Sequence, residues 1–299
     1  PNPPQNQYFR HLLACRPRKA QSLTSSSAPT PIQKFLIWRS KNFKIIKNKD
    51  VIEVARGAEI TTERETHEFA EKMEEGQPFM TTSCCPSYME MARKHAPELQ
   101  KYISTTYSPM IYTAEIAREK YPNAKVVFVG PCIAKRKEVR REDLQGKVDF
   151  VLTYEEIHAI LGGMNIELGE ANIHPVECTS RRSAHGFAEN GGVTAAVKEL
   201  VDGKLDFTTL QIAGLNKKNV GLLKAYGKTG KAPAQFIEVM VCDGGCISGP
   251  SVHTAYGDGK KTFDAELKKS VTTEGISAST GIGALFESRR SCFLPDASM

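Results

Sequence analysis

The chain has 299 residues, 40% hydrophobic and 25% charged, which is enough to bury one large core or two smaller ones. No run approaches the roughly 18–20 apolar residues of a membrane helix, so a spanning protein is not expected. The net charge of +6 comes from residues 1–49, with ten Lys and Arg and no acid; the other 250 residues hold 30 basic and 34 acidic residues, no argument for nucleic-acid binding.

Residues 1–50 form a basic leader that differs from the remaining chain, residues 51–299, which we treat as one catalytic domain. The leader is rich in Ser and Arg, as organelle transit peptides are. A disordered extension is the other interpretation, and a truncated N-terminal lobe is a third. The apolar residues 35–38 within it could form a strand.

From Asp50 onward, short apolar runs alternate with helical patterns. Strands are expected at 50–54, up to Ser83, and at 125–129, 150–153, 207–212 and 236–241. Helices are expected at 63–74 (with Thr61 or Thr62 as N-cap), 86–94, 109–121, 154–161, 179–189, 194–201 and 220–226. This order predicts an α/β fold with parallel or mixed sheets flanked by helices.

Four cysteines follow three of these strands. Cys85 lies in Thr-Ser-Cys-Cys-Pro after the first, Cys132 in Gly-Pro-Cys after the second, and Cys242 and Cys246 in Cys-Asp-Gly-Gly-Cys after the third. Thiolates brought together at strand ends would bind a soft metal or an iron–sulfur cluster. A zinc site of four cysteines, disulfides and buried spectator thiols are the alternatives.

These three segments resemble the signature motifs of the iron-only (FeFe, diiron) hydrogenases, and the similarity extends over about residues 51–255. The resemblance implies a two-lobed catalytic domain with the cluster between the lobes. It implies a 4Fe-4S cubane joined to a diiron subcluster with CO, cyanide and a bridging dithiolate, together called the H-cluster. The implied cubane ligands are Cys85, Cys132, Cys242 and Cys246, and the protein's part is binding and proton supply.

By the same resemblance, Cys84 is not a ligand but a proton donor, since a thiol pKa near about 8.5 suits that role. Glu65, Glu68 and Ser104 correspond to a proton relay; on the residues alone, the two carboxylates could equally be solvated helix side chains. Lys135 corresponds to a donor to an iron-bound cyanide, although its basic run also fits an exposed helix face. The implied pocket residues are Pro131, Met240 and Ser108; Met240 could also be core filler.

Two features depart from the family pattern. No ferredoxin-like cysteine clusters precede the three motifs, which indicates a minimal form that takes electrons directly from an external carrier. The family's Ala-Pro-Ser/Thr pocket segment has one candidate, Ala28-Pro29-Thr30, and it lies closer to the Glu65 helix than expected.

The leading hypothesis is therefore a ferredoxin-type hydrogenase that joins two protons and two electrons reversibly. A hydrogen-sensing relative of low activity is one alternative. A hydrogenase-like iron–sulfur assembly protein with a cubane only is another, although such proteins lack the paired Cys84-Cys85 form. Expected partners are ferredoxin and maturation proteins, with no nucleic acid and no membrane. The expected location is the cytoplasm, or a hydrogenosome or other organelle if the leader is a transit peptide.

Overall fold

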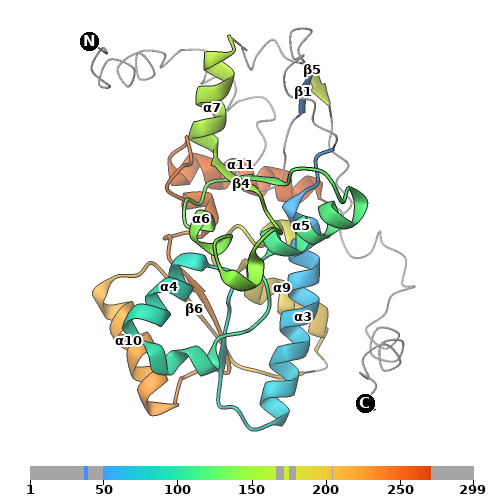
Figure 1. The fold of residues 1–299 in the computed structure, drawn as a ribbon. Coiled ribbons are helices and arrows are strands. Elements are labelled where there is room, and N and C mark those ends of the chain that lie inside the picture. Colours follow the sequence, from blue (N-terminus) through green and yellow to red (C-terminus); the bar gives the residue numbers. More distant parts are fainter. Residues whose placement is uncertain (1–36, 40–49, 166–171, 175–179, 204, 271–299) are drawn as a thin grey trace, which may run out of the picture.

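A computed structural model describes residues 37–39, 50–165, 172–174, 180–203 and 205–270 (Figure 1). The expectations for residues 1–36 and 40–49, including Ala28-Pro29-Thr30, lie outside this part of the chain. β1 (Ile37–Arg39) pairs antiparallel with β5 (Asn172–His174), so the apolar island in the leader does contribute a strand.

The three cysteine motifs follow strands of two parallel sheets. In the first, β7 (Phe236–Met240) lies between β2 (Met80–Thr81) and β6 (Thr209–Ala213). In the second, β3 (Val127–Gly130) pairs with β4 (Phe150–Thr153). Helices cover these sheets, which confirms the predicted α/β class.

Helices lie on both faces of the first sheet. The bounds are Pro86–His95 for α4, Lys217–Thr229 for α10, Val54–Glu74 for α3, Arg182–Gly186 for α8 and Gly192–Val201 for α9. All five β7 side chains are buried, and they alternate: Ile237 and Val239 pack with α4 and α10, whereas Phe236 and Met240 pack with α3, α8 and α9. A central strand covered on both faces is apolar throughout, as parallel sheets require.

The acidic exception on β7 is Glu238, which is fully buried. Its carboxylate accepts hydrogen bonds from the Gly191 and Thr194 amides and the Thr194 hydroxyl, at 2.7–2.8 Å. These donors belong to the first turn of α9, where free amides and the helix dipole favour an anion. Glu238 therefore fastens α9 to the sheet.

The strand expected at 50–54 and the cap expected at Thr61 or Thr62 are wrong. α3 runs from Val54 to Glu74 without a break, and Glu53 is its N-cap residue. The Thr61 and Thr62 hydroxyls donate to the Gly57 and Ala58 carbonyls one turn earlier, so they bond inside the helix instead of capping it. Glu65 consequently lies in mid-helix rather than near a helix start.

The second sheet packs against α5 (Pro109–Lys120), which in turn packs closely on α3. Gly57 makes this close approach possible, because a Cβ at that position would lie 2.1 Å from the Pro109 carbonyl oxygen. Because α3 packs on the first sheet and α5 on the second, the α3–α5 contact connects the two sheets. The remaining elements are η1 (Pro97–Tyr102), α6 (Lys135–Glu138), η2 (Glu142–Leu144), α7 (Tyr154–Gly163), η4 (Cys246–Ser248) and α11 (Tyr256–Lys269). No helix in the described ranges is both long and apolar enough to cross a membrane.

Candidate metal centre

The three cysteine motifs leave the carboxyl ends of strands from both sheets. Cys85 follows β2, Cys132 follows β3 and Cys242 follows β7, as the sequence predicts. All three, with Cys246, line one pocket whose walls also come from α3, α5 and α8. The pocket and its mouth hold about 980 Å³ that no protein atom fills.

The four sulfurs lie near enough to affect one another's ionisation in every pairing. Burial is the main cause that raises the pKa of Cys85, of Cys242 (to about 11) and of Cys246, and the neighbouring thiols add to it. All five cysteines of the described residues are free thiols. Because concentrating unpaired thiolates in a buried pocket is unfavourable, this arrangement indicates a cationic group that binds them together.

The spacing does not suit one metal ion. Within the described ranges, no group of three or more His, Cys, Asp or Glu side chains could hold a single ion. A tetrahedral zinc site needs four ligands about 2.3 Å from one centre. A cubane spreads its four cysteines over four separate irons, so it suits thiols that share a pocket without meeting at a point.

Cys85 lies where a helix end favours an anionic sulfur. It is the N-cap residue of α4, and Pro86 begins the helix. The first turn of α4 forms no capping hydrogen bond with the Cys85 side chain. The backbone amides of Tyr88 and Val241 nevertheless lie near its sulfur and oppose the rise in its pKa. A helix N-terminus beside the sulfur favours its thiolate form.

Glycine lets the third motif pass close to the α8–α9 loop. Gly245 has φ +85°, and a Cβ there would lie 2.6 Å from the Asn190 amide nitrogen and 2.7 Å from the Ala188 carbonyl oxygen. Glycine is therefore required here for a steric reason, since a side chain would push Cys246 out of place.

Lys135 is buried, so the interpretation as an exposed lysine in a basic run is wrong. Its Nζ pairs with Glu138 at 2.8 Å and donates to the Cys84 carbonyl at 3.3 Å. Burial would lower the pKa of Lys135, but Glu138, Cys132 and Cys84 more than offset this and raise it. An ammonium is therefore held on the pocket wall, where it suits an anionic ligand.

Of the three predicted pocket residues, two line the pocket and one does not. Pro131 and Met240 line the pocket, and Met240 also belongs to the core beneath it, so both interpretations of Met240 apply. Ser108 is not on the pocket wall: its hydroxyl donates to Glu138 at 2.6 Å. Ser108 thus acts on the pocket through Glu138, which in turn orients Lys135.

Cys84 and Glu65 form the inner end of a polar path. Cys84 lines the pocket, and its pKa is raised well above the usual value by burial and, secondarily, by the nearby Glu65 carboxylate. Glu65 is completely buried, and burial with the Glu68 charge raises its pKa to about 8. The Ser83 amide and Ser104 hydroxyl face Glu65 and oppose this rise, but neither completes a hydrogen bond of normal geometry.

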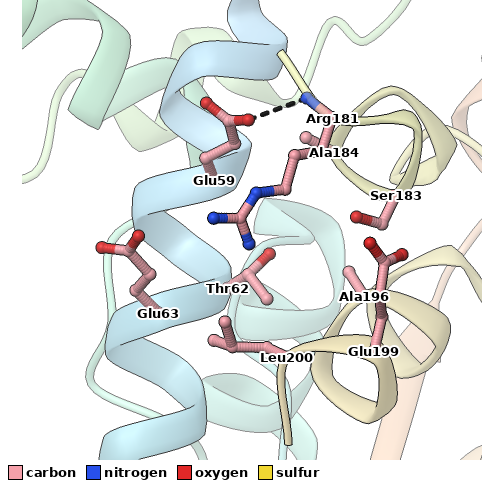
Figure 2. Close-up of a pocket in the computed structure, with 9 residues that line it drawn as sticks. All are labelled: Glu59, Thr62, Glu63, Arg181, Ser183, Ala184, Ala196, Glu199 and Leu200. Atoms are coloured by element: carbon pink, nitrogen blue, oxygen red, sulfur yellow. Dashed lines mark hydrogen bonds between the residues drawn. The ribbon is translucent and has the colours of Figure 1, made fainter. Parts of the chain in front are cut away.

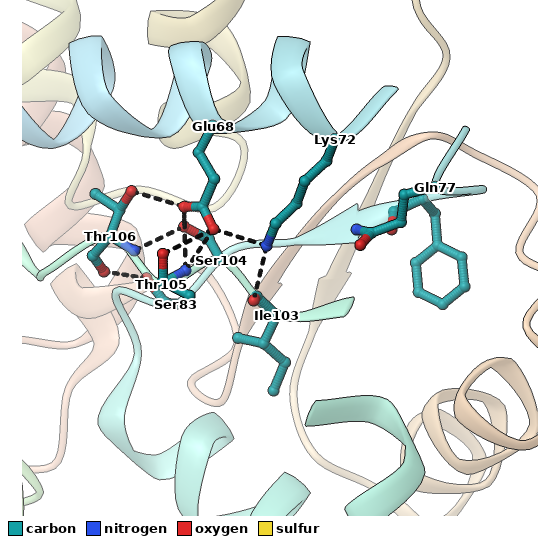
Figure 3. A network of polar contacts seen from close by, with 9 residues as sticks. Glu68, Lys72, Gln77, Ser83, Ile103, Ser104, Thr105 and Thr106 are labelled. Carbon is teal, nitrogen blue, oxygen red and sulfur yellow. Dashed lines mark hydrogen bonds and ion pairs between the residues drawn. The ribbon is translucent and has the colours of Figure 1, made fainter. Parts of the chain in front are cut away.

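Glu68 is the outer end of the path and lies in a dense network (Figure 3). Its carboxylate accepts hydrogen bonds from the Ser104 hydroxyl at 2.6 Å, from the Thr105 amide and hydroxyl at 2.8 and 2.9 Å, and from the Thr106 hydroxyl at 2.9 Å. Lys72 pairs with it at 2.7 Å. Burial alone would raise the pKa of Glu68, but these partners lower it. The structure thus gathers Cys84, Glu65, Ser104 and Glu68 in one region, in which the Ser104 hydroxyl is bonded to Glu68 and the Glu65 carboxyl has no hydrogen bond of normal geometry.

Sequence reasoning missed Lys72, Thr105 and Thr106 in this network. Lys72 stands four residues after Glu68 on the same helix, a spacing that puts both side chains on one face. That signal was available. The two threonines follow Ser104 directly, but nothing in their spacing indicated that both would turn toward α3.

A second pocket lies between α3 and the α8–α9 segment (Figure 2). Glu59, Glu63 and Glu199 surround the Arg181 side chain there, and the Arg181 amide donates to Glu59 at 2.8 Å. Burial is the main cause that raises the pKa of Glu59. The space admits about one water molecule, so this pocket does not compete as a cofactor site.

The four thiols, the open pocket and the ammonium on its wall together suit an iron–sulfur protein. A family model described as "Iron only hydrogenase large subunit, C-terminal domain" matches residues 39–250. This is more than half of the chain, and the chain belongs to that family.

Relatives of two kinds are found. The chain is 27% identical over 242 residues to iron hydrogenase 1 of Clostridium pasteurianum, covering 67% of this chain and 42% of that protein. It is 30% identical over 121 residues to a cytosolic Fe-S cluster assembly factor of Eremothecium gossypii, covering 40% and 27%. The chain thus spans less than half of these two relatives.

A solved structure supports the fold. The FeFe-hydrogenase of Chlamydomonas reinhardtii, in a variant form, superposes with a TM-score of 0.61 at 20% identity, covering 83% of this chain and 82% of that one. The two-lobed hydrogenase architecture expected from the motifs is confirmed.

Proposed function

We propose that this protein is a hydrogenase that interconverts two protons and two electrons with H₂. The observation that carries the proposal is Cys84: a partly buried thiol that lines the pocket with the four cubane cysteines and lies near Glu65, which we take as the first group of a polar path to the surface. A protein that only stores a cubane needs no such proton donor.

The residues fit the family's H-cluster. Cys85, Cys132, Cys242 and Cys246 would hold the cubane, and Lys135, Pro131 and Met240 would bound the space for the diiron subcluster. When bound, the H-cluster supplies the redox chemistry and the site where protons and electrons meet. The apolar wall formed by Phe187, Val54 and Met240 would exclude bulk water from that space.

The side chains of the protein itself would transfer protons between the pocket and solvent. Cys84 Sγ would give and receive the proton at the pocket, and Glu65, being largely neutral at pH 7, would reprotonate it. Ser104 Oγ lies between the two carboxyl groups and can accept from one while donating to the other. Glu68, held ionised, would take the proton from solvent. The electron donor would be a ferredoxin-like carrier, and maturation proteins would install the diiron unit.

Infrared spectroscopy of anaerobically matured protein tests the proposal. Sharp bands in the region of metal-bound CO and cyanide, with H₂ evolved from reduced methyl viologen, are expected. A cubane without those bands, after a maturation that works on a control hydrogenase, would contradict it. Exposure to air should abolish both signals.

An iron–sulfur assembly role with a cubane only is the second candidate. It is favoured by the assembly factors among the relatives, at an identity similar to that of the hydrogenases. For that role the cubane would be present and Cys84 dispensable. A hydrogen sensor would show the infrared bands but low turnover.

A further inference from the structure

Two histidines outside the cysteine pocket lie against each other at the surface. His158 belongs to α7, and His253 lies in the loop between η4 and α11. Their ring centroids are 5.4 Å apart and their ring planes are almost perpendicular, at 84°. Both side chains are exposed, so an ion from solvent can reach them.

The separation of the two rings suits a metal ion between them. Zinc binds an imidazole nitrogen at about 2.0–2.1 Å, so the ring centroid lies roughly 3.2 Å from the metal. Two imidazoles that meet zinc at a tetrahedral angle then have centroids about 5.2 Å apart. The observed separation of 5.4 Å is close to this value. The two rings are therefore already spaced as ligands of one ion.

The imidazoles are available as ligands. Burial and, secondarily, His253 lower the pKa of His158, so its imidazole is neutral at pH 7, the form that binds metal. By contrast, His67 pairs with Glu71 on the same helix. Within the described ranges, the ring contact between His158 and His253 is the interaction that either imidazole makes, so ring nitrogens remain free to coordinate.

An ion at this position would join two segments that flank different cysteine motifs. α7 follows β4, whose partner strand β3 leads into Cys132, whereas the loop with His253 comes after Cys246. Leu161 is the buried residue of α7, and this helix projects from the rest of the molecule (Figure 1). A bond through His158 would therefore fasten a helix that has little packing of its own.

We propose that His158 and His253 bind one divalent transition-metal ion of the zinc class, which fastens α7 to the loop after Cys246. Two imidazoles favour Zn²⁺ over Mg²⁺ or Ca²⁺, which prefer oxygen ligands. Among the described residues no third His, Cys, Asp or Glu joins the pair, so water completes the coordination. The inference does not rest on the proposed function, because both ligands lie outside the cysteine pocket.

Equilibrium dialysis against low micromolar free Zn²⁺, followed by metal analysis, tests the site. The parent should hold one zinc ion more than His158→Asn or His253→Asn. Zinc taken up by the cysteine pocket cancels in this difference, because every variant keeps the four cysteines. His253→Cys supplies another zinc ligand and should retain the extra ion. His95→Asn is the matched control, because His95 is an exposed histidine at the end of α4.

The dependence of thermal stability on zinc gives a second readout. An ion that binds the folded form alone raises the Tm, so zinc should raise the Tm of the parent and of His95→Asn more than that of the other two Asn variants. Rings that only pack against each other would make those two variants less stable by the same amount with and without zinc, which would overturn the proposal. It is also overturned if the parent and both variants hold equal zinc, if His95→Asn loses an ion as well, or if the extra ion binds only at millimolar zinc.

Discussion

Glu65 and Glu68 lie three residues apart on one face of α3, yet their surroundings are opposite. Glu65 is completely buried, lacks hydrogen bonds of normal geometry, and has a pKa near 8. Glu68 accepts hydrogen bonds from four donor groups and forms an ion pair with Lys72, and its pKa is lowered. The same side chain is thus set up to hold a proton at one position and to release it at the other.

The opposite pKa shifts of Glu65 and Glu68 would favour proton transfer in one direction along a short path. Under the proposed function, the neutral carboxyl of Glu65 lies near Cys84, to which it would deliver a proton, and the ionised carboxylate of Glu68 would take up a proton from solvent. Ser104 separates them and contacts both. Two groups whose environments push their pKa values apart are a recognisable pattern in acid–base chemistry.

The largest effect is expected at the inner end of the path. Cys84→Ala removes a pocket-lining thiol whose pKa the Glu65 carboxylate helps to raise. We expect turnover to fall by roughly 10²–10⁴-fold, because proton transfer loses its donor. Iron and sulfide analysis should still find the cubane, since the four ligands are intact. Loss of the cubane in this variant would refute the division between ligands and donor; Cys132→Ala, in contrast, should impair cluster binding.

The second largest effect on turnover is expected for Glu65→Gln. The same variant also tests how the free energy of unfolding depends on pH. Turnover should fall by roughly 10²-fold, because an amide keeps the shape but cannot exchange a proton. The folded-state pKa near 8 lies above the unfolded value of 4.5, so the folded protein binds the proton more tightly. Parent stability should therefore decline between about pH 4.5 and 8, by a few kcal/mol, as the unfolded chain ionises and the folded one does not.

Chemical denaturation of the cubane-loaded parent and variant at about pH 5 and pH 8 checks this sign. Relative to the parent, the Glu65→Gln variant should have a higher free energy of unfolding at about pH 8 than at about pH 5. Glu63→Gln, on the same helix, should show no such change. A difference that is the same at both pH values would contradict the burial of a protonated Glu65.

Lys72→Met should have a moderate effect at the outer end. Without the ammonium, the pKa of Glu68 rises, so this carboxylate becomes protonated at higher pH. The acid limb of the pH–rate profile should move upward, and the rate at neutral pH should fall by roughly three- to tenfold. The Lys72→Arg variant keeps the positive charge, so its pH–rate profile and its rate at neutral pH should be close to those of the parent. An unchanged pH profile in Lys72→Met would show that Glu68 is not on the path.

Thr105→Val should be the smallest change. It deletes one hydrogen bond to Glu68 while the Thr105 amide, Ser104, Thr106 and Lys72 remain. The expected loss is roughly 0.5–1 kcal/mol of stability, and about twofold in rate. A large effect on rate would mean that the network depends on one hydroxyl rather than on shared donors.

The strand ends and cysteine motifs were predictable because their signals are local. An apolar run followed by Cys, Gly and Pro predicts where the chain turns, and all three motifs lie where the sequence predicts them. The length of α3 was not predictable in the same way. Thr61 and Thr62 favour caps in isolation, but packing of Gly57 against α5 requires the helix to continue through them.

The environment of single side chains was the least predictable part. Lys135 stands in a run of charged residues that favours an exposed face, yet its Nζ pairs with the buried Glu138. Ser108, the N-cap residue of α5, in turn donates to Glu138. The signals for Glu65 and Glu68 are identical in sequence, and only the position of the chain around Ser104 distinguishes them. Such differences come from long-range contacts, which a local pattern does not encode.

The placement of the four ligands on three distant loops has a consequence for assembly. Long stretches of chain separate Cys85, Cys132 and Cys242. A group bonded to all of them closes those stretches into loops, and so removes conformational entropy from the unfolded chain much as a set of disulfides would. The same bonds tie the β2–β7–β6 sheet to the β3–β4 sheet. Under the proposed function, the protein without its cluster would lack this cross-link between the two sheets, and its free energy of unfolding should be lower.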